Sequence, residues 1–405
     1  MSRRRTALLS ALSAASLSSL GGGCRTSAPT VSARAEPAAA NVQPGERALL
    51  KPNRFDAPMP MTAPTTVYLR LTAEECRRAA RDHAGIANLL DGLAARPGLT
   101  EASCFRSRTT CDAADTLRRG IAHDLSEDVR SRTAAAALDL YYRLQEAELL
   151  QDVLTASLVE VDGLIADGET AVKAGAREPA ELATAKLKRG ELLGKQTEAK
   201  AGIARLSTEL KGLLGLDAVP GRLLPVDAVN VTPELLDAAT AAGAAVQNRA
   251  DLRALRGLAA GLNDDTAPTV QAALGAVSPL AGAALPPLPK LSGLALLCKT
   301  PDTSALREAV QAAAKDKERE VIRETTAALD ELLARQDALI VTRQATTDAD
   351  KRLDDATVKV KNGVLGAADL RKVKLDKLQA DADEIRAIYA WKLAEIKLRR
   401  ALGAL

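Results

Sequence analysis

The stretch from Thr133 to Leu216 reads TAAAALDLYYRLQEAELLQDVLTASLVEVDGLIADGETAVKAGAREPAELATAKLKRGELLGKQTEAKAGIARLSTELKGLLGL. Its first half carries apolar residues every seven positions in two rows: Leu140, Ala147, Leu154 and Val161, and Leu144, Leu158, Ile165 and Val172. Two such rows form a seam that one helix buries against another. The pattern stops at Gly175, since glycine readily adopts the left-handed conformation that ends a helix. It resumes after Pro179, because proline suits a first helical turn. We therefore predict a long helix, a tight turn and a second long helix returning beside the first.

The same pattern recurs near the C-terminus. Matching pairs keep one constant spacing: Lys173-Ala174-Gly175 with Lys361-Asn362-Gly363, Glu181-Leu182 with Asp369-Leu370, Lys186-Leu187 with Lys374-Leu375, Leu210 with Leu398, and Gly215 with Gly403. One or two such matches could arise by chance, but a whole series in register indicates a duplication. The expected fold is mainly all-α, with duplicated long antiparallel α-hairpins in a coiled-coil bundle.

These features together resemble the TolC-type outer-membrane efflux proteins, which are built from two such repeats. The resemblance covers roughly Leu71 to Leu405. Its marks are the helix openings LTAEECRRAARDH (71–83) and QNRADLRAL (247–255), the turns KAGAREPAEL and KNGVLGAADL, and the endings GLLGL (212–216) and RALGAL (400–405). Each mark is weak alone, and the order and spacing of all of them make the resemblance fairly specific.

The resemblance implies a periplasmic helical conduit that three copies form as a homotrimer. In that family the hairpin tips open and close the tube and meet a periplasmic adaptor, which links it to an inner-membrane pump. The matching positions for partner binding are Gly175, Arg177, Glu178, Pro179, Leu182, Gly363, Gly366, Asp369 and Leu370. An alternative remains open, in which the glycines only close the turns and the leucines only pack the helices.

Composition narrows the function classes. Alanine, leucine and charged residues dominate, which is typical of long helices and coiled coils. The formal net charge is +3, and no basic patch with interleaved aromatics occurs, so nothing indicates nucleic-acid binding. The sequence also lacks a nucleophile motif, a glycine-rich phosphate loop and the spacing of metal ligands. We therefore expect a protein that is not an enzyme and needs no cofactor or metal.

The N-terminus is typical of a targeting segment. Residues 1–23 combine Arg3-Arg4-Arg5 with a short apolar stretch and three glycines, as in a signal peptide. Cys24 follows at the position where a lipoprotein is lipidated, although a leucine one position too far away makes the match imperfect. Residues 24–66, rich in alanine, proline and serine, are interpreted as the lipidated cysteine and a disordered tether. We expect attachment to the periplasmic face of the outer membrane through this lipid, and the alternative is an ordinary signal peptide.

Four further cysteines stand at positions 76, 104, 111 and 298. In an oxidising envelope compartment such residues can pair, and Cys104 and Cys111, which bracket a short loop, are the candidate disulfide. Free thiols are the alternative.

The two repeats are assigned to residues 67–231 and 232–405. Thr72 and Glu75 have the capping-box spacing that opens a helix, expected to reach about Ala95. Thr232-Pro233 is expected to open the first helix of the second repeat. The segment 263–299 carries five prolines, and KLSGLALLCK (290–299) within it is a candidate strand.

Family members place two membrane strands in each repeat, and this sequence departs from that pattern. A spanning strand needs about nine to eleven residues. The first repeat offers only PGLTEASCFRSRTT (97–110), and the second lacks aromatic residues between positions 263 and 302. We therefore expect little or no β-barrel. Two functions stay open: a TolC-like outer-membrane efflux or secretion component, and a structural or scaffolding envelope coiled-coil lipoprotein without transport activity.

Overall fold

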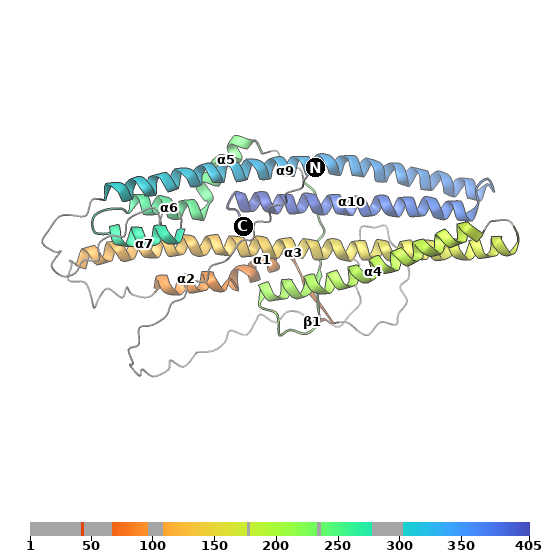
Figure 1. Ribbon diagram of the computed structural model, residues 1–405, viewed down its shortest axis with the longest axis horizontal. Coiled ribbons are helices and arrows are strands. Elements are labelled where there is room, and N and C mark those ends of the chain that lie inside the picture. The colour runs from red at the N-terminus through yellow and green to blue at the C-terminus, as the bar shows by residue number, and fades with distance from the viewer. Residues whose placement is uncertain (1–41, 44–66, 96–107, 176–178, 233–235, 278–302) are drawn as a thin grey trace, which may run out of the picture. The chain divides into compact units, whose positions relative to one another are not determined.

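A computed structural model describes residues 42–43, 67–95, 108–175, 179–232, 236–277 and 303–405 (Figure 1). The chain divides into two compact units, Met1–Ala40 and Asn41–Leu405, and every described residue belongs to the second. The account below concerns that second unit alone.

Four long helices dominate this unit: α3 (Arg108–Lys173), α4 (Pro179–Leu214), α9 (Ser304–Lys361) and α10 (Ala367–Ala401). Helix α4 packs against α3, α3 packs against α10, and α10 packs against α9. The long helices thus stand side by side in the order α4, α3, α10, α9 (Figure 1). The predicted fold, mainly helical and made of duplicated antiparallel hairpins, is confirmed.

The predicted seam accounts for this packing. Leu144, Leu158 and Val161 of α3 are buried, and the remaining residues of its two apolar rows are half-buried. They pack with α4 and α10 in clusters that include Ile203, Leu210, Leu378, Ile385 and Tyr389. Two positions in every two helical turns are apolar. Each helix therefore presents a narrow apolar stripe to its neighbour and keeps charged residues on the remaining surface.

Five short helices pack on the half of this layer that lies away from the two hairpin turns (Figure 1). They are α1 (Ala73–Asp82), α2 (Gly85–Ala95), α5 (Ala238–Asn248), α6 (Ala250–Ala260) and α7 (Ala267–Val277). Helices α1 and α2 pack against α3, while α6 packs between α3 and α9. A second apolar cluster, with Ile121 of α3, Leu258 of α6, Leu274 of α7 and Val310 of α9, joins these helices.

The first repeat begins with the predicted capping box. The Thr72 hydroxyl accepts from the Glu75 N–H at 3.2 Å, and the Glu75 carboxylate accepts from the Thr72 N–H at 2.9 Å. The expectation of one helix up to Ala95 was wrong, because the chain breaks into α1 and α2 at His83 and Ala84. Asn88 Nδ2 donates to the Asp82 carbonyl at 2.8 Å and so satisfies an acceptor that the break leaves without a helical partner.

One expectation for the second repeat was also wrong. Its first described helix begins at Ala238 rather than beside Thr232, because Asp237 is the N-cap and its carboxylate accepts from the N–H groups of Ala239 and Thr240. The segment 263–299 contains α7, in which Pro268 falls in the first turn where it needs no N–H partner. The candidate strand 290–299 lies outside the described residues, as does most of 97–110.

A small sheet fixes the start of the first repeat. Strand β2 (Tyr68–Leu71) pairs in parallel with β3 (Arg222–Pro225), and Leu69 lies opposite Leu223. Strand β1 (Val42–Gln43), within the segment expected to be a tether, pairs antiparallel with β2. Just after β3, Asp227 accepts from the Ala73 N–H at 2.5 Å and from the Tyr141 hydroxyl at 3.1 Å. This carboxylate ties α1 and the strand segment to the middle of α3.

Among the described helices, none combines the length and the apolar character that crossing a lipid bilayer requires.

Candidate functional site

The two hairpin turns close in the same way. Gly175 and Gly363 have φ of 67° and 70°, and the equivalent glycines at the far ends of the hairpins, Gly215 and Gly403, have φ of 67° and 69°. After α9 the Gly363 N–H donates to the Val360 carbonyl at 3.0 Å and the Val364 N–H to the Lys359 carbonyl at 2.9 Å. This pair of bonds is a Schellman motif, which satisfies carbonyls left free at a helix end.

The tip residues predicted from the sequence are placed in part. Gly175 and Gly363 occupy the left-handed positions, Pro179 is the first residue of α4, and Gly366 is the N-cap of α10. Leu182 and Leu370 are half-buried, and Asp369 pairs with Lys372 at 3.3 Å. Arg177 and Glu178 lie outside the described residues. The glycines therefore have a structural role, and partner binding at the tips stays a prediction.

The second tip exposes an apolar side chain that sequence reasoning did not single out. Val364 directly follows Gly363 and is 76 % exposed. In a Schellman motif the residue at this position often makes an apolar contact with its own helix. The exposed Val364 therefore leaves apolar surface available at the outermost point of the second hairpin.

Ion pairs join the two hairpins just behind the tips. Arg371 of α10 reaches across to α3, where its guanidinium contacts Asp167 at 2.9 Å and Glu160 at 3.2 Å. Lys374 contacts the same Glu160 at 3.0 Å. We call these four residues the inter-hairpin latch. Asp167 lies beside the guanidinium and raises the pKa of Arg371, so the charge is permanent at any physiological pH.

A glycine makes room for the latch. A Cβ atom added at Gly163 of α3 would lie 2.2 Å from the nearest nitrogen of the Arg371 guanidinium. In the interior of a helix glycine costs about 1 kcal/mol relative to alanine. Glycine at this position therefore lowers the stability of helix α3 but leaves room for the Arg371 side chain to cross it.

We expect the Gly163→Ala substitution to displace Arg371 without stabilising the protein. The gain of up to about 1 kcal/mol in helix propensity is offset by the loss of the latch contacts. Gly120→Ala is the matched control, because that glycine is on the same helix and meets nothing within 4 Å. Urea unfolding should show a higher free energy of unfolding for the control alone. Equal stabilisation of both variants would mean that Gly163 has no steric role.

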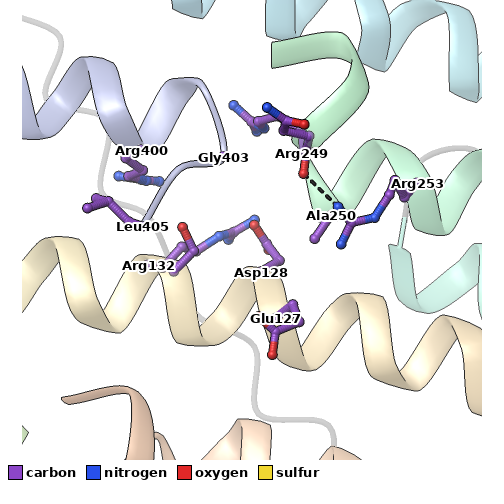
Figure 2. A pocket seen from close by; sticks show the side chains of 11 residues that line it. Glu127, Asp128, Arg132, Arg249, Ala250, Arg253, Arg400, Gly403 and Leu405 are labelled. Atoms are coloured by element: carbon purple, nitrogen blue, oxygen red, sulfur yellow. Dashed lines mark hydrogen bonds and ion pairs between the residues drawn. The ribbon is translucent and has the colours of Figure 1, made fainter. Parts of the chain in front are cut away.

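A charged cavity of about 150 Å³ lies where the two repeats meet, between α3, the start of α6 and the end of α10 (Figure 2). Its arginines are largely neutralised within the fold. Arg132 pairs with Asp128 at 2.5 Å, Arg253 pairs with Asp124 at 3.2 Å, and Arg249 pairs with Asp251 and Glu324, both at 2.5 Å. Of these pairs, Arg253–Asp124 joins the second repeat to the first, and the others hold the arginines within their own repeats. We call this region the junction between the repeats.

The best-buried member of this junction is the Arg249–Asp251 pair, whose side chains are 11 % and 8 % exposed. Burial alone would raise the pKa of Asp251. Hydrogen bonds and positive charge from Arg249, with Lys317 at 3.2 Å, outweigh that effect and lower the pKa to about 2. A carboxylate held ionised in this way stabilises the folded state wherever the unfolded state would bind a proton more tightly.

We therefore expect acid to weaken the junction. The contribution of Asp251 is complete above its ordinary pKa of 3.8 and is lost as the pH falls toward about 2. Its size is about 2 kcal/mol. The free energy of unfolding should fall less between pH 5 and pH 2.5 in Asp251→Asn than in the parent, whereas Asp316→Asn, at a side chain 74 % exposed, should keep the parental slope. Identical slopes in all three proteins would contradict this account.

Other predicted residues cannot be placed. Cys24 and Cys104 lie outside the described residues, and Cys111 belongs to α3, although its side chain is not described. Lipidation and the disulfide therefore stay predictions. Cys76 of α1 is buried with a free thiol, and burial raises its pKa to about 12. Across the described ranges, no group of three His, Cys, Asp or Glu side chains is placed to hold a metal ion.

Comparison by sequence finds no matching family model and no matching curated protein. Solved structures do share the fold. The CmeC outer-membrane channel of Campylobacter jejuni is 12 % identical, with 82 % of this chain and 85 % of that chain covered at a TM-score of 0.57. VceC of Vibrio cholerae is 14 % identical, with 82 % of this chain and 96 % of that chain covered at a TM-score of 0.57. The MtrE channel of Neisseria gonorrhoeae is 14 % identical, with 82 % of this chain and 88 % of that chain covered at a TM-score of 0.59. The chain has the fold of TolC-type outer-membrane channels.

Proposed function

We propose that this chain, which has the fold of the TolC-type channels, is a non-enzymatic component of an outer-membrane efflux or secretion system. Three copies would form a periplasmic helical conduit attached by a lipid on Cys24 to the periplasmic face of the outer membrane. The hairpin tips would meet a periplasmic adaptor and, through it, an inner-membrane pump. The observation that carries the proposal is the layer α4, α3, α10, α9, in which each outer helix packs against one long neighbour.

The exposed face of α4 is unusual in composition. Small residues recur there at helical spacing and are exposed, and they are Ala183, Gly190, Gly194, Thr197, Ala201 and Ala204. Gly190 and Gly194 meet nothing within 4 Å, so packing inside one chain does not explain them. Each glycine inside a helix costs about 1 kcal/mol. A second helix approaching closely along this face gives the small residues a role.

The exposed face of α9 has the complementary character. Leu333, Ile340 and Val341 are exposed there, the last two by 60 % and 70 %. Counted from the hairpin turns at about 1.5 Å per residue, they stand at the same height as Thr197–Thr208 of α4. Large side chains on one edge and small ones on the other fit a head-to-tail contact between identical chains. Such a contact is heterologous and forms a ring when the rotation closes.

We expect the full-length protein, purified in mild detergent, to sediment as a trimer. Replacing both Gly190 and Gly194 with leucine should abolish the trimer, because the larger side chains block close approach of a second helix. The same change should raise the thermal stability of the isolated chain, since leucine is a better helix former by roughly 1 kcal/mol per site. Gly120→Leu, on α3, is the control and should remain trimeric.

The functional test is complementation. Cells that lack the gene should become more sensitive to toxic compounds, and the parental chain should restore resistance while the Gly190→Leu/Gly194→Leu variant should not. A parental protein that is monomeric at micromolar concentration, in cells whose sensitivity does not change, would favour the scaffolding lipoprotein without transport activity.

A further inference from the structure

An open groove of about 360 Å³ lies between α3 and α4, close to the first hairpin turn. Its volume is within the range of small-molecule sites, about 300–1,000 Å³. Most of its lining is apolar and half-buried, and consists of Leu164, Gly168 and Val172 of α3 with Leu182 and Ala185 of α4. The three α3 positions recur every four residues, so the apolar lining runs about 12 Å along the helix.

Two lysines lie together at the end of the groove that is away from the turn. They are Lys188 of α4 and Lys372 of α10. Their neighbours in sequence, Arg189 and Arg371, lie against α3 one or two residues before Leu164, which places both lysines at this height. The groove therefore combines an apolar channel with a cationic end, and the two cations come from different hairpins.

Both ammonium groups can bind a further anion. In the described part of the chain, Lys188 pairs with Glu191 and Lys372 pairs with Asp369, each at 3.3 Å and within its own helix. Exposed pairs of this kind contribute little to stability. Glu181, the acidic residue of the lining, stands seven residues nearer the turn than Lys188, roughly 10 Å along α4. Its negative charge is thus at the opposite end of the groove.

The second hairpin does not repeat this arrangement. Its cavity, of about 270 Å³, has other residues at the matching positions: Arg352 for Leu164, Val373 for Ala185, and Asp376 for Lys188. The position of Gly168 carries Ala356, which is buried. The second cavity is smaller, and a carboxylate takes the place of a lysine. Duplication alone therefore does not account for the groove of the first hairpin.

We propose that the groove binds an amphipathic anion of the fatty-acid class, with its alkyl chain between α3 and α4 and its carboxylate on Lys188 and Lys372. Burial of the methylene groups against the apolar lining favours the chain. The two ammonium groups select the anionic head group, because charge-assisted hydrogen bonds are stronger than neutral ones. An occupied groove connects α4 to α10 beside the inter-hairpin latch. All residues of the site belong to one chain, so the site does not require the trimeric conduit proposed above.

Protection of a cysteine by octanoate tests the site in the full-length protein. Ala185→Cys is labelled in isolated membranes with a water-soluble maleimide, and the rate is measured by mass spectrometry of the peptide that carries position 185. We expect octanoate to slow this labelling about threefold or more, with half of the effect at a concentration on the order of 1 mM. Val373→Cys, at the matching position of the second hairpin, is the control and should keep its rate. Acetate, which lacks the chain, and octylammonium, whose head group is positive, should protect neither position.

Charge exchange gives a result that a packing role alone would not produce. Adding Lys188→Glu and Lys372→Glu to Ala185→Cys should abolish protection by octanoate and allow protection by octylammonium. Gly168→Ala should raise the octanoate concentration needed for half protection about threefold or more, because it narrows the groove. The fold should tolerate this change, since the added Cβ meets only Leu182, at an ordinary contact distance of 3.4 Å.

Three results would overturn the proposal. The first is an unchanged labelling rate at position 185 in octanoate. The second is equal protection at positions 185 and 373, which would show a general effect of octanoate on the membrane. The third is a rate at position 185 that is slow in membranes without octanoate and rises on purification, because another protein would then cover the groove in place of a small anion.

Discussion

Reversing the charge at position 371 should let the two hairpin tips move apart. In Arg371→Glu the new carboxylate faces Glu160 and Asp167 across the inter-hairpin latch, where the parent has contacts of 3.2 Å and 2.9 Å. Half-exposed ion pairs are each worth about 1 kcal/mol or less, and like charges at the same distance cost a similar amount. The combined change of about 1.5 kcal/mol corresponds to roughly a tenfold larger population of separated tips.

Spin labels on Thr170→Cys of α3 and Lys361→Cys of α9 would measure this separation in chains diluted with unlabelled protein. The distance distribution should gain a longer component in Arg371→Glu. Restoring opposite charges by adding Glu160→Lys and Asp167→Lys should remove it. Arg386→Glu, which disturbs an exposed pair with Asp383 within α10, should leave the parental distribution unchanged. A longer component of equal size in Arg386→Glu would show that any charge change on α10 loosens the tips.

If the chain is a conduit, the latch variant should also alter its use in cells. A tube whose tips separate more readily is a weaker barrier to large molecules. Cells carrying Arg371→Glu should therefore admit large antibiotics that the parental cells keep out. The rescued variant with Glu160→Lys and Asp167→Lys should regain the barrier. An unchanged barrier together with separated tips would assign the latch to stability alone.

The long helices were predictable because their signals are local and repeated. Seven-residue apolar rows, a glycine after each helix and Pro179 at a helix start act through the backbone of the residues that carry them. The structure ends α3, α9 and α10 within one or two residues of the predicted positions. The duplication gave independent support for the hairpin turns, because the glycine predicted to end one long helix, Gly175, has a counterpart in Gly363.

The features that connect the hairpins were harder to predict. The latch joins residues more than two hundred positions apart, and neither Glu160 nor Arg371 differs locally from a charge on a solvated helix face. One signal was present: Gly163 interrupts a strong helical pattern in which alanine would be more stable. The break at His83 and Ala84 was also missed, because neither residue is a proline or a glycine.

A large loss of stability should come from an alanine at Gly403. This glycine has φ of 69°, and an added Cβ would lie 3.0 Å from the carbonyl carbon and oxygen of Asn248. A left-handed alanine costs about 1 kcal/mol, and pressing a side chain into a backbone that cannot move aside costs about 1–3 kcal/mol more. That backbone leads directly into Arg249, so the strain would reach the junction between the repeats.

The duplication supplies its own control for this prediction. Gly363 has the same conformation, with φ of 70°, but nothing lies within 4 Å of an added Cβ. We expect Gly363→Ala to lower the free energy of unfolding by about 1 kcal/mol and Gly403→Ala by about 3 kcal/mol, as measured by urea denaturation. The difference between them isolates the contact with Asn248. Equal losses would show that the left-handed backbone alone determines both glycines, and that the end of α10 is not closely packed on the start of α6.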